Sequence, residues 1–326
     1  MQAAFFTRIM HTRGFGLGVG IIAFLAACFY FFGGYAENIP GDRGLALPSA
    51  NEWFANTYVD FGAAMGGAVA AMIILLLLNK VHNVLRSMTS VYIAFFGAMM
   101  AATANLFVQF YTGTVLLIIV ALSLLLILGC YRDVKATPRV YLIFLLLSGF
   151  AATQYCFIFY LPVFLIACAQ MRIFNGRTFV AAMLGIITPW WIMLGFGIIT
   201  LSDIHLPQLI SVFAGIGPED TVLLLITVGL TALLFLTALV LNLMKAIAYN
   251  ARSRAVNGVI SITALATIVA MCADYRNLIA YVPLLDFFAA LQAAHYLSTH
   301  RVDKSYIIIA VILVIYAALF VCQTVM

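Results

Sequence analysis

An acidic residue lies within one of the apolar stretches of this chain. Asp286 is eight residues into the run 279–297, about 12 Å along a helix. A carboxylate at that depth costs about 2.5–3.5 kcal/mol on membrane-insertion scales, so it should face protein or water. Pro283 lacks an N–H and should free a carbonyl in the preceding turn. Two interpretations stay open: Asp286 lines a polar cavity, or it holds two helices together through a hydrogen bond. Gln292 and His295 follow on other faces of the same helix.

Two further carboxylates follow the first apolar run. Glu37 and Asp42 lie in the segment 35–60, which also contains Trp53 and Tyr58, residues typical of a membrane interface. A carboxylate at a membrane surface can act as a general base or hold a divalent cation, the one cofactor that this pattern suggests. We take Glu37 and Asp42 as the candidate catalytic pair; the alternative is that both are simply solvated.

Four more polar residues, with Asp286, are candidates for substrate binding. Asn105 and Gln109 are four residues apart and would share one face of a helix. Gln154 lies where a long apolar run is interrupted. Such amides usually bridge helices, and the alternative is a path for a polar ligand. Arg276 would lie on the same side of the membrane as Glu37 and could offset its charge.

Several signatures of known chemistry are missing from the sequence. There is no P-loop, no dinucleotide-binding glycine motif, no H-E-x-x-H and no G-x-S-x-G. The six cysteines are scattered, with no C-x-x-C and no histidine cluster that could bind zinc. ATP-driven transport by this chain alone is therefore not expected, and whether the protein is an enzyme stays open.

The composition of the chain indicates that these residues are positioned by membrane-spanning helices. Apolar residues make up 66% of the 326, charged residues only 8%, and the mean hydropathy is +1.15. Soluble domains average about 25% charged residues, so a soluble enzyme is excluded. We predict an all-α polytopic membrane protein, with residues 1–326 forming a single integral membrane domain.

Each crossing needs about 20 apolar residues, somewhat fewer in a sheltered position. The run 140–171 is too long for one helix, and Gly149, Thr153 and Gln154 suggest two short helices that meet at a polar turn. Two full crossings or a re-entrant pair are both open there. With that division, we predict eleven transmembrane helices: 15–34, 61–79, 90–110, 114–131, 140–153, 155–171, 178–200, 221–244, 259–273, 279–297 and 306–324.

The basic residues orient these spans. Arg8 and Arg13 precede the first span, so the N-terminus should be cytoplasmic and the C-terminus outside. Alternating from there leaves only Arg43 and Arg276 of the 16 basic residues on the outer side. This distribution predicts a multi-pass protein of the bacterial inner (cytoplasmic) membrane, with the lipid bilayer and not nucleic acid as its partner.

The two long connections, 35–60 and 201–220, both fall on the outer side. They mix apolar and turn-forming residues, so we predict that they pack together as one lid, with Glu37 and Asp42 above Asp286. Small residues are spaced for close helix approach at Gly14 to Gly20 and at Gly62 and Gly66, for packing within the chain or for a dimer.

One stretch of the chain resembles a known family. The segments LNKVHNVLRSMTSVY from Leu78, FYLPVFLIACAQMRIFNGRTF from Phe159 and LGIITPWW from Leu184 resemble a family of uncharacterised bacterial polytopic inner-membrane proteins. The similarity covers about 79–195 and implies a location but no activity. The whole chain is more loosely similar to membrane glycosyltransferases and glycan polymerases that use polyprenyl-phosphate sugars. That similarity implies a catalytic acid at Glu37 or Asp42 and a polyprenyl-phosphate lipid as partner.

Three functions remain open at this point. The first is a membrane subunit that serves cell-envelope biogenesis together with other membrane proteins. The second is a lipid-linked glycan enzyme, which predicts that Glu37 or Asp42 faces a groove. The third is a transporter or flippase of an amphiphilic substrate, which predicts a polar path that includes Asp286.

Overall fold

The computed structural model describes residues 12–37, 39, 44–84, 90–205, 218–246, 249–299 and 305–325. Within these ranges the secondary structure is entirely helical. The α-helices are α2 (Arg13–Phe32), α3 (Thr57–His82), α4 (Val91–Ala102), α5 (Ala104–Phe107), α6 (Thr112–Leu128), α7 (Thr137–Ala151), α8 (Tyr160–Gln170), α9 (Gly176–Gly195), α10 (Pro218–Ala246), α11 (Ala251–Ala273), α12 (Leu278–Thr299) and α13 (Ser305–Val325). The 3-10 helices are η1 (Ala50–Glu52), η2 (Tyr155–Phe159), η3 (Leu201–Asp203) and η5 (Tyr275–Asn277).

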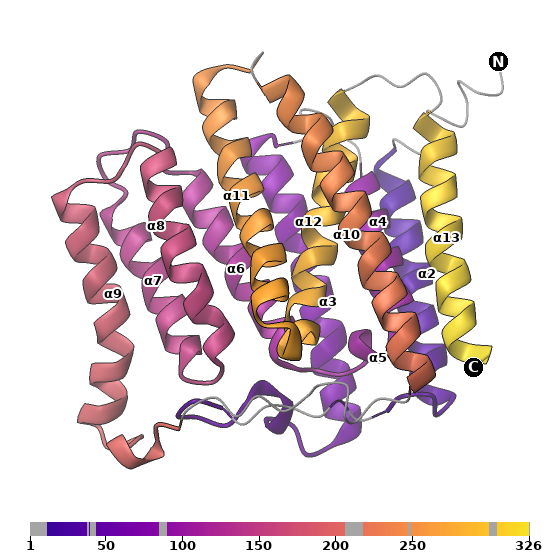
Figure 1. Ribbon diagram of the computed structural model, residues 1–326, viewed down its shortest axis with the longest axis horizontal. Coiled ribbons are helices and arrows are strands. Elements are labelled where there is room, and N and C mark those ends of the chain that lie inside the picture. Colours follow the sequence, from indigo (N-terminus) through magenta and orange to yellow (C-terminus); the bar gives the residue numbers. More distant parts are fainter. Residues whose placement is uncertain are drawn as a thin grey trace.

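The protein is a multi-pass membrane protein. Seven of the described helices are long and apolar enough to cross a bilayer, and α4, α6, α7 and η2 with α8 form shorter apolar helices. Every apolar run identified in the sequence contains a helix, and consecutive runs alternate in direction between the upper and lower ends of the bundle (Figure 1). The lower end, where α2 ends and α10 begins, also carries the end of α13 (Figure 1).

Two of the apolar runs are interrupted. In 140–171, α7 ends at Ala151 and the chain returns through η2 and α8, so the predicted division into two helices is confirmed. In 90–110 the structure differs from the prediction, because α4 ends at Ala102 and α5 covers only Ala104–Phe107. Thr103 breaks the helix, with its hydroxyl donating to the Met100 carbonyl (3.2 Å). Gln109 therefore lies beyond the helix that carries Asn105.

Helix α12 occupies the centre of the bundle. It packs against α4, α6, α10 and α11, and 94% of its most apolar 18-residue stretch is buried. The corresponding share is 17% in α13, 22% in α2 and 28% in α9, so these three helices leave broad apolar faces for lipid. Asp286, on α12, therefore lies in the most enclosed part of the protein.

The glycine motifs of α2 and α3 face different surroundings. A Cβ atom on Gly16 would lie 2.3 Å from the Ser90 carbonyl oxygen, and Gly20 lies close to Gly97 of α4. These two glycines therefore serve helix packing within the chain. A Cβ atom on Gly62 or Gly66 would have no other atom within 4 Å.

The first long loop crosses the lower end of the bundle. The N–H groups of Ala46 and Leu47 donate to the Ala152 carbonyl (2.9 and 3.0 Å), and the Asn51 side chain accepts from the Thr112 N–H (3.2 Å). The His205 N–H donates to the Leu45 carbonyl (2.9 Å), which joins this loop to the second long connection. Asp42 and Arg43 lie outside the described residues.

Candidate functional site

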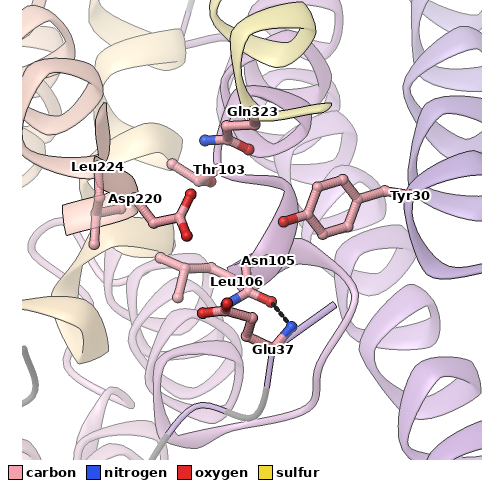
Figure 2. A pocket seen from close by; sticks show the side chains of 8 residues that line it. All are labelled: Tyr30, Glu37, Thr103, Asn105, Leu106, Asp220, Leu224 and Gln323. Atoms are coloured by element: carbon pink, nitrogen blue, oxygen red, sulfur yellow. Dashed lines mark hydrogen bonds between the residues drawn. The ribbon is translucent and has the colours of Figure 1, made fainter. Parts of the chain in front are cut away.

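A small polar pocket lies at the lower end of the bundle, between α2, α5, α10 and α13 (Figure 2). Its volume is about 30 Å³, enough for water but far below the roughly 300–1,000 Å³ of a small-molecule site. The carboxylates of Glu37 and Asp220 and the hydroxyl of Tyr30 point into it (Figure 2). The described lining contains no basic side chain. It consists of Tyr30, Glu37, Thr103, Asn105, Leu106, Asp220, Leu224 and Gln323.

Two amides hold Glu37 at this pocket through its backbone. The Asn105 side chain accepts from the Glu37 N–H (3.0 Å), and the Gln109 amide donates to the Glu37 carbonyl. Gln109 also accepts from the Ile39 N–H (3.1 Å) and donates to Asn105 (3.1 Å). These side chains therefore fix the chain after α2 and leave the Glu37 carboxylate free to face the pocket.

A side chain of α13 forms hydrogen bonds with the backbone on both sides of the break between α4 and α5. The Gln323 amide donates to the Ala102 carbonyl (2.6 Å) and accepts from the Ala104 N–H (2.9 Å), satisfying two backbone groups that the break leaves open. Because Gln323 also lines the pocket, the end of α13, the break and the pocket form one hydrogen-bonded unit.

Polar side chains continue from the pocket along one face of helix α10. Asp220 lies in its first turn, where the helix dipole favours a carboxylate. Thr227 and Thr231 follow seven and eleven residues later, on the same face of the helix, and both are buried. The Thr231 hydroxyl lies 2.8 Å from the Tyr316 hydroxyl of α13.

Asp286 lies in the protein interior, as predicted, with 2% of its surface exposed. The hydroxyls of Tyr111 and Tyr316 are close enough to interact electrostatically with its carboxyl group. The sequence also predicts contact with a polar partner or water, and Asp286 Oδ2 has no hydrogen-bond partner among the described residues. A buried acceptor of this kind is open to a proton or a water molecule.

Pro283 has the expected effect on the backbone of α12. A proline cannot donate to the carbonyl four residues earlier, which here belongs to Ile279. The Tyr111 hydroxyl donates to this carbonyl instead (3.4 Å). Tyr111 is thereby tied to the proline turn and lies near enough to Asp286 to interact with it electrostatically.

Buried polar residues continue toward the upper end of the bundle. The Asn242 amide of α10 donates to the backbone carbonyl (2.9 Å) and side-chain oxygen (2.7 Å) of Gln292, and Asn242 Oδ1 has no partner among the described residues. One turn further along α12, His295 Nε2 lies 3.4 Å from the Tyr249 hydroxyl. We call this series the polar seam: Asp220, Thr227, Thr231 and Asn242 of α10, Asp286, Gln292 and His295 of α12, and Tyr316 and Gln323 of α13.

The remaining predicted site residues lie elsewhere. Gln154 is buried at the turn between α7 and η2, and its Oε1 atom has no partner within the described ranges. Arg276 is exposed, and its Nε donates to the Tyr275 hydroxyl (3.4 Å). Neither residue lines the pocket or the polar seam.

A separate carboxylate was missed by the sequence reasoning. Asp274, in the turn between α11 and α12, accepts hydrogen bonds from the hydroxyls of Tyr155 (2.9 Å) and Tyr281 (3.1 Å). Burial raises the pKa of Asp274, and the two tyrosine hydrogen bonds partly oppose this shift. Both of its oxygens have a partner, which contrasts with Asp286.

The polar seam was also largely missed, although α10 carries a readable signal. Asp220, Thr227 and Thr231 are spaced seven and four residues apart in an otherwise apolar run, so they share one helix face. Tyr316 and Gln323 repeat this spacing in α13. Helix periodicity could have identified both faces but not the fact that they meet.

Comparison with protein-family models, curated proteins and solved structures finds no match to this chain. Nor do three or more His, Cys, Asp or Glu side chains come together as a metal site within the described ranges. The functional argument therefore rests on the pocket and the polar seam.

Proposed function

We propose that this protein is a proton-coupled transporter of the bacterial inner membrane, with Asp286 as the proton-binding group. The eleven apolar segments cross the bilayer, the N-terminus is cytoplasmic, and the lower end of the bundle faces outside. Two observations support this orientation. The termini of the described chain lie at opposite ends of the bundle (Figure 1), and the described basic side chains other than Arg276 belong to its upper end.

The observation that carries the proposal is the state of Asp286. Its carboxyl group is buried in the central helix, and one oxygen accepts no hydrogen bond from the described residues. Ionisable residues in such positions are costly to keep and are characteristic of proton relays in pumps and transporters. A single carboxyl group flanked by tyrosines suits a proton, since a metal ion would require several clustered oxygen ligands.

The polar seam supplies the rest of the path. Glu37 and Asp220 place two carboxyl groups at the outer pocket, Asp286 binds a proton near mid-membrane, and His295 with Tyr249 lies toward the cytoplasm. Thr231 and Asn242 are eleven residues apart on α10, about 16 Å. Because no hydrogen bond spans that distance, proton movement needs water or a change of conformation.

Two places in the fold can provide that change of conformation. Pro283 weakens α12 one turn before Asp286, and the break at Thr103 divides α4 from α5 beside the outer pocket. Movement at these points would expose Asp286 to one side of the membrane at a time, as alternating access requires. An amphiphilic solute of the cell envelope remains the substrate class that we propose.

A lipid-linked glycan enzyme is the second candidate, because Glu37 lines a pocket with a second carboxylate. The volume of about 30 Å³ argues against it, since a sugar does not fit without a large opening. The third hypothesis, a membrane subunit for envelope biogenesis, would use the apolar faces of α2, α9 and α13. Contact with lipid accounts for these faces equally well.

Charge displacement in proteoliposomes on a solid support tests the proposal without a known substrate. A step in pH should give a transient current in the wild-type protein and none in Asp286→Asn. Asp203→Asn is the matched control, since Asp203 is an exposed carboxylate whose hydrogen bonds within the described ranges come from the Thr200 N–H and hydroxyl. Equal currents in Asp286→Asn and the wild type would rule the proposal out.

A further inference from the structure

A second and much larger cavity lies at the upper end of the bundle, between the end of α3 and the start of α11. Its volume is about 490 Å³, within the range of small-molecule sites. The walls combine valine side chains with polar residues: His82, Asn83, Asn250, Arg252, Ser253 and Asn257. This cavity is far from the outer pocket and shares no residue with the polar seam.

The cavity is positively charged. Its described lining contains Arg252 and no carboxylate. Within the described ranges the one ion pair joins Arg139 to Asp133 (3.6 Å), so no described carboxylate pairs with the Arg252 guanidinium. His82 is near enough to Arg252 to interact electrostatically, and its ring is held by a hydrogen bond between Nε2 and the Leu125 carbonyl (3.1 Å).

Hydrogen-bond donors converge on the same space. The Asn250 side chain caps α11 by accepting from the Ser253 N–H (2.9 Å). The N–H groups of Ala251 and Arg252 lie in the first turn of α11, where an α-helix offers its N–H groups no partner of its own and the helix dipole also favours an anion. Across the cavity, Asn83 ends α3 in a left-handed conformation (φ 52°), and the Asn257 amide lies one turn beyond Ser253.

We propose that this cavity binds a phosphate group, carried by an anionic lipid or by a soluble phosphate compound. Arg252 supplies a bidentate charged donor, and the α11 N-terminus and the asparagine amides supply neutral donors. The cavity lies at the ends of two membrane-spanning helices, the level of lipid headgroups, and basic pockets in that position bind anionic headgroups. Val81 and Val256 provide an apolar wall for the start of an acyl chain.

Thermal stabilisation of the purified full-length protein in detergent tests this site independently of proton transport. The probes are phosphatidylglycerol, phosphatidylcholine and inorganic phosphate, each titrated alone. We expect phosphatidylglycerol to stabilise the protein and phosphatidylcholine to have little effect. Stabilisation by inorganic phosphate as well would assign the site to soluble phosphate compounds, and its absence would assign it to a lipid.

Two variants of equal charge locate the effect. Arg252→Gln should raise the apparent dissociation constant of the stabilising ligand about ten-fold, the loss expected for one charge-assisted hydrogen bond. Arg254→Gln is the control, because Arg254 is exposed, two residues further along α11, and does not line the cavity. Its binding should stay within about two-fold of the wild type, as a charge outside the cavity is screened by solvent.

Equal weakening in the two variants, or equal stabilisation by phosphatidylcholine, would overturn the proposal, since both results indicate a nonspecific surface effect. If Arg252→Gln does not fold, Asn257→Ala and His82→Gln take its place. Both substitutions alter the walls of the cavity, and each should weaken binding several-fold. Unchanged binding in both would also overturn the site.

Discussion

Two helix pairs in this bundle bury polar side chains in different ways. Between α7 and α9, the Trp190 indole donates to the Ser148 hydroxyl (3.0 Å), which donates to the Ile186 carbonyl (2.7 Å). The Tyr141 hydroxyl likewise donates to Thr188 (3.3 Å). On α10 and on α12, which pack against each other, Asn242 Oδ1 and Asp286 Oδ2 have no partner among the described residues.

The difference separates stabilising polar contacts from functional ones. At the α7–α9 contact, each of these donors has an acceptor, so the side chains join two helices in lipid. On α10 and α12, these two buried acceptors are left without a hydrogen bond, at a free-energy cost of about 1–3 kcal/mol each. Such a cost is characteristic of sites where function is favoured over stability.

The largest expected effect comes from removing the carboxyl group of Asp286. Asp286→Leu should abolish proton-dependent currents and at the same time stabilise the protein by about 1–3 kcal/mol, because it replaces an unsatisfied buried carboxyl with an apolar group. Thermal unfolding in detergent and currents in proteoliposomes measure the two effects. A destabilised variant would indicate that Asp286 holds the helices together.

Gly185 offers the opposite outcome at the α7–α9 contact. A Cβ atom there would lie 2.6 Å from the Tyr141 carbonyl oxygen, so Gly185→Ala should lower stability by about 1–3 kcal/mol. The folded fraction should retain wild-type currents. Gly66→Ala, where a Cβ would meet nothing within 4 Å, is the control and should change the unfolding free energy by less than about 0.5 kcal/mol.

A smaller effect is expected at Ser148. Ser148→Ala leaves the Trp190 indole N–H without its acceptor and should lower the unfolding free energy by about 1 kcal/mol. Currents should be unaffected, because the contact lies outside the polar seam. Lost currents in a folded Ser148→Ala protein would contradict the distinction between the two helix pairs.

The smallest expected effect is the contribution of Asp274 to the dependence of stability on pH. Burial raises the pKa of Asp274 in the folded protein, so the folded state holds this proton to a higher pH than the unfolded chain. The stabilisation is fully present below the unfolded pKa of about 3.9 and is lost as pH rises through the folded pKa. Asp274→Asn should flatten the dependence of the unfolding temperature on pH in this range. A slope that is unchanged in the variant would assign it to other groups.

The apolar runs predict the helices well because each must satisfy its own backbone in lipid. Even the division of 140–171 follows from the polar residues around Gln154. The site is harder to predict, because Glu37, Asn105, Asp220 and Gln323 meet through contacts between distant helices. Arg276 shows the same limit, since it is exposed, bonds the neighbouring Tyr275 hydroxyl and does not line the pocket with Glu37 and Asp220.

The central claim is that Asp286 exchanges a proton with the aqueous phase through the polar seam. Infrared difference spectroscopy of the full-length protein, recorded during steps in pH, observes this exchange directly. We predict a carbonyl band of a protonated carboxyl group that disappears as pH rises and is absent from Asp286→Asn but present in Asp203→Asn. A spectrum of Asp286→Asn identical to that of the wild type across the range where the protein stays folded would contradict the claim.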